Sequence, residues 1–285
     1  MTTQSQIWQY MWESAISRSS LNHRMNSIST KEGLNLSAES WYKNYDHKFD
    51  LDDLQKTPEF EEEFNRLKRF ITKDSTVLDI GAGMGRLAVP LAREVHKLTA
   101  IEPAGVYMNV MRDKATRDGV GNIEFSEDLW LDFPLQEKYD LVYSTWSPAV
   151  RDPAALMKMH EASRGYCALE LVASPPNLWD FAGQIYPMIM GEEFRPPGNY
   201  LNIVTTLYDQ GIYANIEAWR FDKELRHQTM EEAVEIWKMS LGNYTRINDE
   251  VEEKLRQFYQ SRMNPDGSYT FRLNGGVSCM IWWHV

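Results

Sequence analysis

The chain has 285 residues, of which 43% are hydrophobic and 25% charged, a composition typical of a globular protein with one large domain or a core with additions. The net charge of −11 is spread along the chain and disfavours a nucleic-acid partner, because phosphates require a basic surface. No apolar run reaches the roughly 18 residues of a membrane span, and the opening MTTQSQIWQYMWES lacks the basic and apolar segments of a secretory signal. Cys167 and Cys279 both lie in apolar stretches, so we expect two reduced core residues in a cytoplasmic protein.

Strand and helix patterns alternate between Thr76 and Ala173. The apolar runs TVLDI, KLTAIEP, NIEF, YDLVYSTW and YCALELVA predict strands, and YDLVYSTW is apolar enough to be buried on both faces. The segments GRLAVPLAREV, GVYMNVMRDKATRDG and PAALMKMHEASRG predict helices, with a kink at Pro90 and a stop at Gly165. This alternation predicts a parallel sheet with helices on both faces.

The alternation ends after Ala173. Residues 174–199 are rich in Pro, Gly and aromatics and show no clean period, after which YLNIVTTLYDQG predicts a helix and IYANIEAWRF a strand. A capping box of Thr229 and Glu232 opens one amphipathic helix, and NDEVEEKLRQFYQSR predicts another. The last segment, SYTFRLNGGVSCMIWWHV, predicts two strands joined at Asn274-Gly275-Gly276.

Three glycines separate the first strand from the first helix in VLDIGAGMGRLAVPLA, residues 77–92. Glycine weakens both elements, so its presence indicates a ligand that approaches the backbone closely. In the dinucleotide fingerprint G-x-G-x-x-G the last glycine would stand at Arg86, whereas here it comes one residue early, which suits a ligand without a pyrophosphate. Glu102 ends the second strand about twenty residues later, where a carboxylate can accept hydrogen bonds from two ribose hydroxyls.

The motifs VLDIGAGMGR, AIEP and KYDLVYS resemble the core of the class I S-adenosylmethionine-dependent methyltransferases. The resemblance covers roughly residues 75–173 and implies a Rossmann-like, doubly wound, seven-stranded, mostly parallel sheet, here with an aromatic-rich helical lid. It implies S-adenosyl-L-methionine as the cofactor, with the glycines along its methionine and ribose portion, Glu102 on the ribose, Asp128 on the adenine amine, and Ser144 near its amino-acid end. The full set of cofactor-binding residues expected from the resemblance is Asp79, Gly81, Ala82, Gly83, Gly85, Glu102, Pro103, Tyr107, Asp128, Leu129, Trp130 and Ser144.

The resemblance also divides the chain. We expect an N-terminal helical lid segment in residues 1–70, the cofactor-binding core in 71–173, a lid insertion in 174–213, and the last strands of the core in 214–285 with a helical insertion in 222–268. Aromatic residues concentrate outside the core, so we expect some of them to form a lid over an apolar acceptor pocket, where their faces would also favour a sulfonium. The substrate-binding residues expected in this lid are Trp12, Trp41, Tyr42, Tyr45, Trp179 and Tyr200.

The reaction expected is in-line methyl transfer to a small-molecule acceptor, for which the protein mainly aligns the acceptor and excludes water. No motif names a catalytic residue: STWSPAV stands where N-methylating relatives carry Asn/Asp-Pro-Pro-aromatic, no acidic cluster predicts a metal, and His160 and His227 are most simply structural. The alternatives are transfer of the aminocarboxypropyl group, a regulatory protein that binds the cofactor without turnover and, more distantly, a nicotinamide dehydrogenase. The acceptor, the atom methylated and the oligomeric state stay open.

Overall fold

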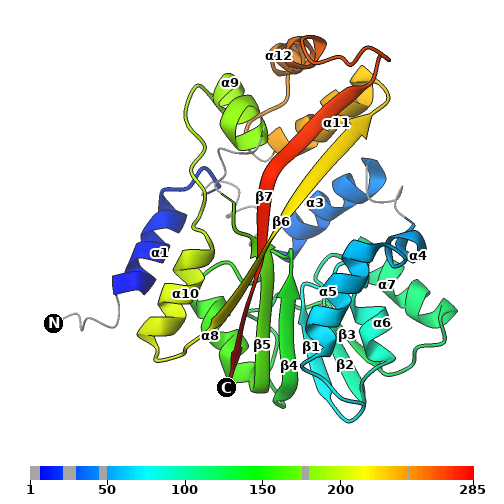
Figure 1. The fold of residues 1–285 in the computed structure, drawn as a ribbon, viewed down its shortest axis with the longest axis vertical. Helices are drawn as coiled ribbons and strands as arrows, with labels where there is room; N and C mark the ends of the chain where they lie inside the picture. The colour runs from blue at the N-terminus through cyan, green and yellow to red at the C-terminus, as the bar shows by residue number, and fades with distance from the viewer. Residues whose placement is uncertain (1–6, 22–29, 45–49, 175–179, 243) are drawn as a thin grey trace.

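The computed structural model describes residues 7–21, 30–44, 50–174, 180–242 and 244–285. Seven strands form a single sheet across the middle of the molecule, and helices cover both of its faces (Figure 1). Within these residues no helix is both long and apolar enough to span a membrane.

The sheet has the order β3-β2-β1-β4-β5-β7-β6. Its strands are β1 (Thr76–Ile80), β2 (Lys97–Ile101), β3 (Ile123–Ser126), β4 (Tyr139–Thr145), β5 (Ser163–Val172), β6 (Asn215–His227) and β7 (Tyr269–His284). The first five run parallel, and β7 is antiparallel to both β5 and β6. The predicted seven-stranded, mostly parallel α/β fold is therefore confirmed.

Two layers of helices pack on the sheet. On one face α5 (Pro58–Lys68), α6 (Ala88–Ala92) and α7 (Gly105–Arg117) bury apolar side chains such as Leu67 and Met108 against the strands. On the other face α8 (Pro153–Ala162), α10 (Tyr200–Asp209) and α1 (Ile7–Ser17) form a second cluster around Leu156 and Ile203. Burying both faces explains the near-continuous apolar character of β4.

Two further helices lie above the carboxyl ends of the first strands. Helix α3 (Lys31–Asn44) packs on α7, and Gly105 N–H donates to Asn35 Oδ1 at 2.7 Å. Helix α4 (Leu51–Leu54) is followed by Gln55, whose side-chain amide donates to the Arg86 carbonyl at 2.8 Å. These bonds tie the N-terminal segment to the two loops that follow β1 and β2.

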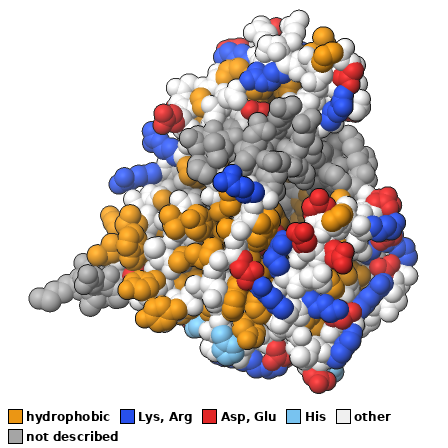
Figure 2. All heavy atoms as spheres, in the orientation of Figure 1, with side chains coloured by type: hydrophobic (Ala, Val, Ile, Leu, Met, Phe, Trp, Pro, Cys, Tyr) orange, Lys and Arg blue, Asp and Glu red, His pale blue; other side chains and the backbone are white. Residues whose placement is uncertain are grey.

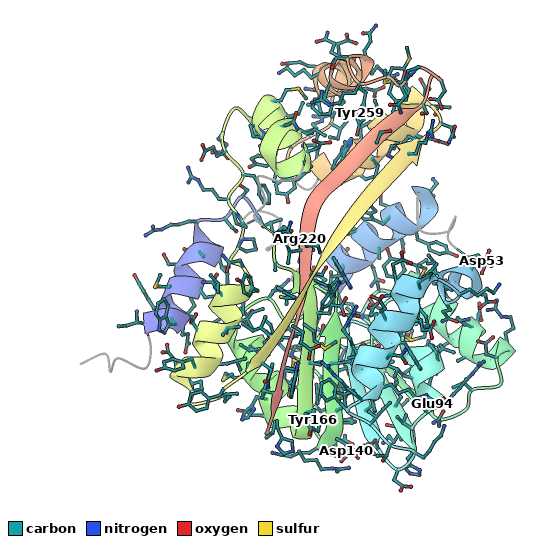
Figure 3. The ribbon with its side chains drawn as sticks, in the orientation of Figure 1. Asp53, Glu94, Asp140, Tyr166, Arg220 and Tyr259 are labelled. Carbon is teal, nitrogen blue, oxygen red and sulfur yellow. The ribbon has the colours of Figure 1, made fainter. Side chains whose placement is uncertain are left out.

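A helical lobe stands beyond the sheet, at the top of Figure 1. We use this name for η4 (Phe181–Ile185), α9 (Tyr186–Met190), α11 (Met230–Leu241) and α12 (Asp249–Gln260) with the outer ends of β6 and β7. The lobe has its own apolar core, which includes Tyr259 (Figure 3). There Trp237 donates its indole N–H to the Tyr259 hydroxyl. It is joined to the rest of the chain chiefly through the two long strands.

The structure corrects three local expectations. The C-terminal segment has no turn at Asn274-Gly275-Gly276, because β7 runs through it, and the register there advances by two residues on β6, from Phe221 to Lys223, against three on β7. Such a bulge bends the ribbon, as Figure 1 shows for β7.

Helix α8 ends at Ala162, and Gly165 lies inside β5, where a Cβ would come within 2.4 Å of the Asp140 carbonyl oxygen. Helix α6 begins only at Ala88, which places Pro90 in its first turn, where the missing N–H costs nothing, so no longer helix remains to be kinked.

Candidate functional site

A cavity of about 530 Å³ opens at the carboxyl ends of β1, β2 and β4. The glycine turn and the ends of these strands form one part of its wall. Apolar side chains of α3 and α4 form another part, among them Leu34, Trp41 and Leu51. Figure 3 shows Asp140 and Tyr166 at the opposite end of the sheet, where Asp140 pairs with Arg164. The cavity thus occupies the edge at which open α/β sheets bind ligands.

Glu102 is a buried carboxylate on the cavity wall, with an exposed fraction of 8%. Gly83 N–H donates to its Oε2 and Ala104 N–H to its Oε1, both at 2.9 Å. Burial raises its pKa, and the two backbone hydrogen bonds oppose that rise. Each oxygen keeps further acceptor capacity, so the carboxylate can bind two more donors in one plane.

The three glycines of the turn have different surroundings. All have positive φ, and a Cβ at Gly83 would meet no atom within 4 Å, so bare backbone faces the cavity there. A Cβ at Gly81 would collide with the Ser147 side chain, and one at Gly85 would lie 2.5 Å from Met111 Cγ of α7. Gly83 therefore leaves room for a ligand, whereas Gly85 allows helix packing.

Asp79, at the end of β1, combines deep burial with a position on the cavity wall. The Tyr143 hydroxyl donates to its Oδ2 at 2.5 Å. Burial raises the pKa of Asp79 to about 7, with the Tyr143 hydrogen bond lowering it and the nearby Glu102 raising it further. A cationic group in the cavity would favour the ionised form of this carboxyl.

Two lining residues, Arg86 and Trp146, each donate to a buried carboxylate beside the cavity. Arg86, which lines the cavity, donates to both carboxylate oxygens of Glu63 at 2.6 and 2.7 Å. Trp146 follows β4 with a φ of 53°, and its indole N–H donates to Glu170 Oε1 at 3.3 Å. Burial raises the pKa of Glu170 to about 7, an effect that Glu63 reinforces and Arg66 opposes. A bulky residue in the left-handed region is uncommon, so Trp146 is a candidate functional residue of the cavity.

The structure brings together part of the predicted cofactor set. Six members lie on the cavity wall: Asp79, Gly81, Ala82, Gly83, Glu102 and Tyr107. Six others lie off the cavity wall: Gly85, Pro103, Asp128, Leu129, Trp130 and Ser144.

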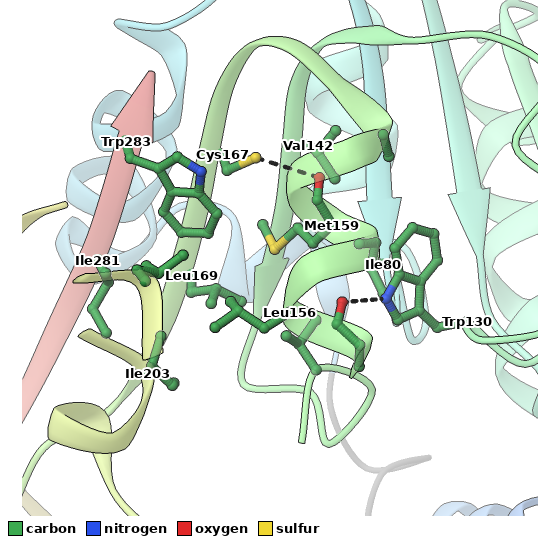
Figure 4. Close-up of a cluster of buried hydrophobic side chains, with 14 of the residues drawn as sticks. Ile80, Trp130, Val142, Leu156, Met159, Cys167, Leu169, Ile203, Ile281 and Trp283 are labelled. Atoms are coloured by element: carbon green, nitrogen blue, oxygen red, sulfur yellow. Dashed lines mark hydrogen bonds between the residues drawn. The ribbon is translucent and has the colours of Figure 1, made fainter. Parts of the chain in front are cut away.

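Three of these six make hydrogen bonds within the protein. Trp130 is buried beside α8, and its indole N–H donates to the Ala155 carbonyl at 3.0 Å (Figure 4). Ser144 donates its hydroxyl to the Ile80 carbonyl at 2.7 Å and so links β4 to β1. Asp128 is exposed, and its carboxylate accepts from Ser126 Oγ at 2.7 Å.

The predicted aromatic lid is only partly present around the cavity. Trp41 lines it, and Tyr42 contacts Tyr107 edge to face at 6.4 Å between ring centroids. Trp12 and Tyr200 instead pack in the apolar cluster of α1, α8 and α10. Tyr45 and Trp179 lie outside the described residues.

Sequence reasoning includes Trp41 of α3 in the site but misses the rest of the wall that α3 and α4 supply, as well as Arg86 and Trp146 as lining residues. In the sequence, Arg86 is only the residue that breaks the dinucleotide pattern, and Trp146 only ends an apolar run. No local pattern marks either residue, because their roles depend on Glu63 and Glu170, which are distant in the sequence. Among the described residues, no group of three or more His, Cys, Asp or Glu side chains could hold a metal ion.

Comparisons with known proteins agree with this geometry. A family model described as "Methyltransferase domain" matches residues 77–164. The "Probable ribosomal RNA small subunit methyltransferase A" of Methanosphaera stadtmanae is 33% identical over 85 residues, which are 29% of this chain and 30% of that protein. The chain therefore spans less than a third of the length of this curated relative.

Solved structures show the same fold at low sequence identity. A candidate methyltransferase of Bacillus halodurans has a TM-score of 0.56 and 16% identity, over 78% of this chain and 98% of that one. The magnesium protoporphyrin IX methyltransferase of Synechocystis, solved with bound S-adenosylhomocysteine (SAH), has a TM-score of 0.52 and 15% identity, over 68% and 92%. The glycine turn and the acidic strand end both lie within residues 77–164, the segment that matches a methyltransferase domain, a kind of domain whose cofactor is S-adenosylmethionine.

Proposed function

We propose that this protein is a cytoplasmic enzyme that transfers a methyl group from S-adenosylmethionine to a small-molecule acceptor. One observation carries the proposal: the buried Glu102 carboxylate and the bare backbone of Gly83 share one wall of the cavity and are hydrogen-bonded to each other. Two buried cysteines without a disulfide support a reducing compartment.

The chemistry of the cavity wall fits the cofactor. Glu102 would accept hydrogen bonds from the two ribose hydroxyls, and Gly83 leaves the space that a side chain would fill. Asp79 would hold the ammonium group of the methionine portion, because a cation offsets the cost of ionising a buried carboxyl. Trp41 and Tyr107 provide aromatic surface for the adenine on the side of α3.

When bound, S-adenosylmethionine supplies a methyl group already activated by the positive sulfur. The tasks left to the protein are to orient the acceptor and to exclude water. Leu34, Leu51 and Leu54 of the cavity wall are apolar and would keep water away from the reacting groups. Trp146, at the end of β4 beside Glu170, is the residue we propose to contact the acceptor.

Charge supports a small acceptor over an RNA. The curated relative is named for ribosomal RNA, but the match covers only 85 residues, 29% of this chain, and this chain has a net charge of −11. RNA binding requires a basic surface to neutralise phosphates.

The test uses S-adenosylmethionine labelled in its methyl group, incubated with the full chain and either a metabolite extract or ribosomal RNA. We expect label in a low-molecular-weight product from the extract and none in the RNA. Label retained on the released thioether would identify aminocarboxypropyl transfer. Cofactor binding without turnover in either arm would contradict the enzyme and support a regulatory protein.

A further inference from the structure

Helices α1 and α10 present an exposed apolar surface next to the start of β6. We name it the α1–α10 patch and define it by eight residues that are each more than a third exposed: Ile7, Trp8, Tyr10, Met11, Leu201, Tyr208, Tyr213 and Ile216. Tyr213 is 79% exposed and Tyr10 is 70% exposed. Figure 2 shows hydrophobic side chains gathered over this part of the molecule, at the lower left.

The patch rests on a fixed scaffold. Helix α1 packs along α10, and Trp8 N–H donates to the Asp209 carboxylate at 3.1 Å. The rings of Tyr208 and Tyr213 meet edge to face at 6.1 Å. Asp209 is the only charged residue in the sequence of α10, and Glu13 is the only one in that of α1, where it accepts from Gln9 at 2.9 Å. The surface is therefore ordered and nearly free of charge.

The patch is larger than a monomer ordinarily exposes. Taking about 200 Å² for a large apolar or aromatic residue, the eight residues together leave roughly 900 Å² exposed to water. The largest apolar patch of a typical monomer is about 300–600 Å², and each partner of a standard interface buries about 800 Å². The area is that of one half of a stable dimer.

The open edge of the sheet lies beside the patch. Strand β6 is the last in the sheet, and in the described parts of the chain only β7 pairs with it. Along Asn215–Arg220, Glu217 and Trp219 face α5, where they contact Arg69 and Arg66. Ile216 and Ala218 therefore point to the opposite face, the face of α10. The unpaired backbone edge and the apolar patch form one continuous surface.

We propose that two copies of this chain associate through this surface, with their β6 strands paired antiparallel across a two-fold axis. An axis perpendicular to the sheet relates the same face of both copies, so the α1–α10 patch of one copy meets the same patch of the other. Such an interface is self-complementary, because each outer backbone group of β6 finds its partner in the copy. Pairing also covers an edge that would otherwise promote aggregation.

The charge pattern favours a second copy over a membrane. Helices that lie on membranes carry lysine and arginine around their apolar face. Neither α1 nor α10 contains a basic residue, and the whole chain has a net charge of −11. An uncharged, self-complementary surface is what two acidic copies need in order to meet.

The test is sedimentation equilibrium of the full chain at tens of micromolar. We expect the wild type to have the mass of a dimer. Ile216→Lys places a lysine from each copy in the interface, and we expect it to weaken the dimer at least about 100-fold, because buried like charges cost several kcal/mol. The matched control is Met263→Lys, which changes an exposed apolar residue beyond α12 and should leave the dimer intact.

A second measurement guards against misfolding of the variant. Amide hydrogen exchange of residues 215–220 in the wild type should slow as the protein concentration rises, whereas exchange in α12 should not change. A monomeric wild type, a dimer that survives Ile216→Lys, or binding of the wild type to phosphatidylcholine vesicles would overturn the inference. It does not depend on the proposed function, and Ile216→Lys should bind SAH as the wild type does.

Discussion

The carboxylate of Glu102 holds the loops after β1 and β2 together and keeps acceptor capacity for a ligand. Its two oxygens accept the N–H groups of Gly83 and Ala104, which come from the loops after β1 and β2. An ionised carboxylate offers about four acceptor positions, so half of them remain for a ligand after both backbone bonds are made. No other residue type of this length combines the two tasks.

We therefore expect Glu102→Gln to weaken SAH binding at least about tenfold. Glutamine replaces one acceptor oxygen by an NH₂ donor, so one of the two ribose hydroxyls would lose its acceptor, and a buried donor left unpaired costs about 1–3 kcal/mol. Isothermal titration calorimetry measures the affinity, and the control is Glu124→Gln on the exposed part of β3. Equal affinity in both variants would remove Glu102 from the site.

Asp79 makes stability depend on pH in an unusual direction for a carboxyl. Its pKa is about 7 in the folded protein against an ordinary 3.8, so the folded state keeps a proton that the unfolded chain releases between these values. Its contribution to stability is complete below about pH 4 and is lost as the pH rises through 7. Glu170, with a pKa of about 7, acts in the same direction.

Urea unfolding from pH 5 to pH 8 checks this effect. The free energy of unfolding of the wild type should fall across this range by about 1–3 kcal/mol more than that of Asp79→Asn, which keeps the acceptor for Tyr143 but does not titrate. Parallel profiles for the two proteins would show that Asp79 stays ionised in the fold.

At the scale of elements, the strand–turn–helix unit assigns different tasks to similar residues. Gly83 and Gly85 both have positive φ, but only the first borders open space, while the second lies against Met111 of α7. The sequence pattern cannot separate the two, since the difference arises from a helix that follows one strand later.

The pair supplies a matched test of this element. We expect Gly83→Ala to cost about 1 kcal/mol of stability but to reduce SAH affinity strongly, because its methyl group would enter the cavity. Gly85→Ala should lower the thermal midpoint more than Gly83→Ala does. Adding Met111→Ala to the Gly85→Ala variant should restore part of that loss, because it removes the clash. Thermal unfolding and calorimetry of the three variants test these two roles. A larger loss of SAH affinity in Gly85→Ala than in Gly83→Ala would show that Gly85, and not Gly83, makes room for the ligand.

Most helices and strands could be predicted from the sequence. The wrong predictions fall at glycines, which occur in turns, at helix ends and at close contacts inside strands. The five strands from β1 to β5 and helices α7, α8, α10, α11 and α12 follow from apolar period and caps. Gly275 and Gly276 resemble a hairpin turn, yet they lie beside a bulge inside β7. Gly165 resembles a helix stop, yet it lets β5 pass close to the Asp140 carbonyl. Local patterns cannot show which neighbour a glycine accommodates.

At the scale of the whole molecule, the site could be predicted only where one local motif builds it. Asp79, Gly83 and Glu102 come from the loops of two consecutive strands, and all three lie on the cavity wall. Trp130 and Trp12 are core residues because α8 and α10 pack against them, which only the tertiary structure reveals. The wall from α3 and α4 is equally nonlocal, and the boundaries expected for the lid segments remain predictions.

The whole molecule also separates its tasks in space. The cavity lies at the carboxyl ends of the central strands, while the α1–α10 patch and the free edge of β6 lie on the outer side of the sheet. A change in association should therefore leave cofactor binding intact, and a change in the glycine turn should leave the dimer intact.

The most direct measurement is calorimetric titration of the wild-type chain with SAH. The account predicts one site per chain with an affinity in the micromolar range or better, together with a rise in thermal midpoint as the ligand saturates the folded state. The absence of both binding heat and thermal shift at millimolar ligand would contradict it, because the cavity between Gly83 and Glu102 would then not be a cofactor site.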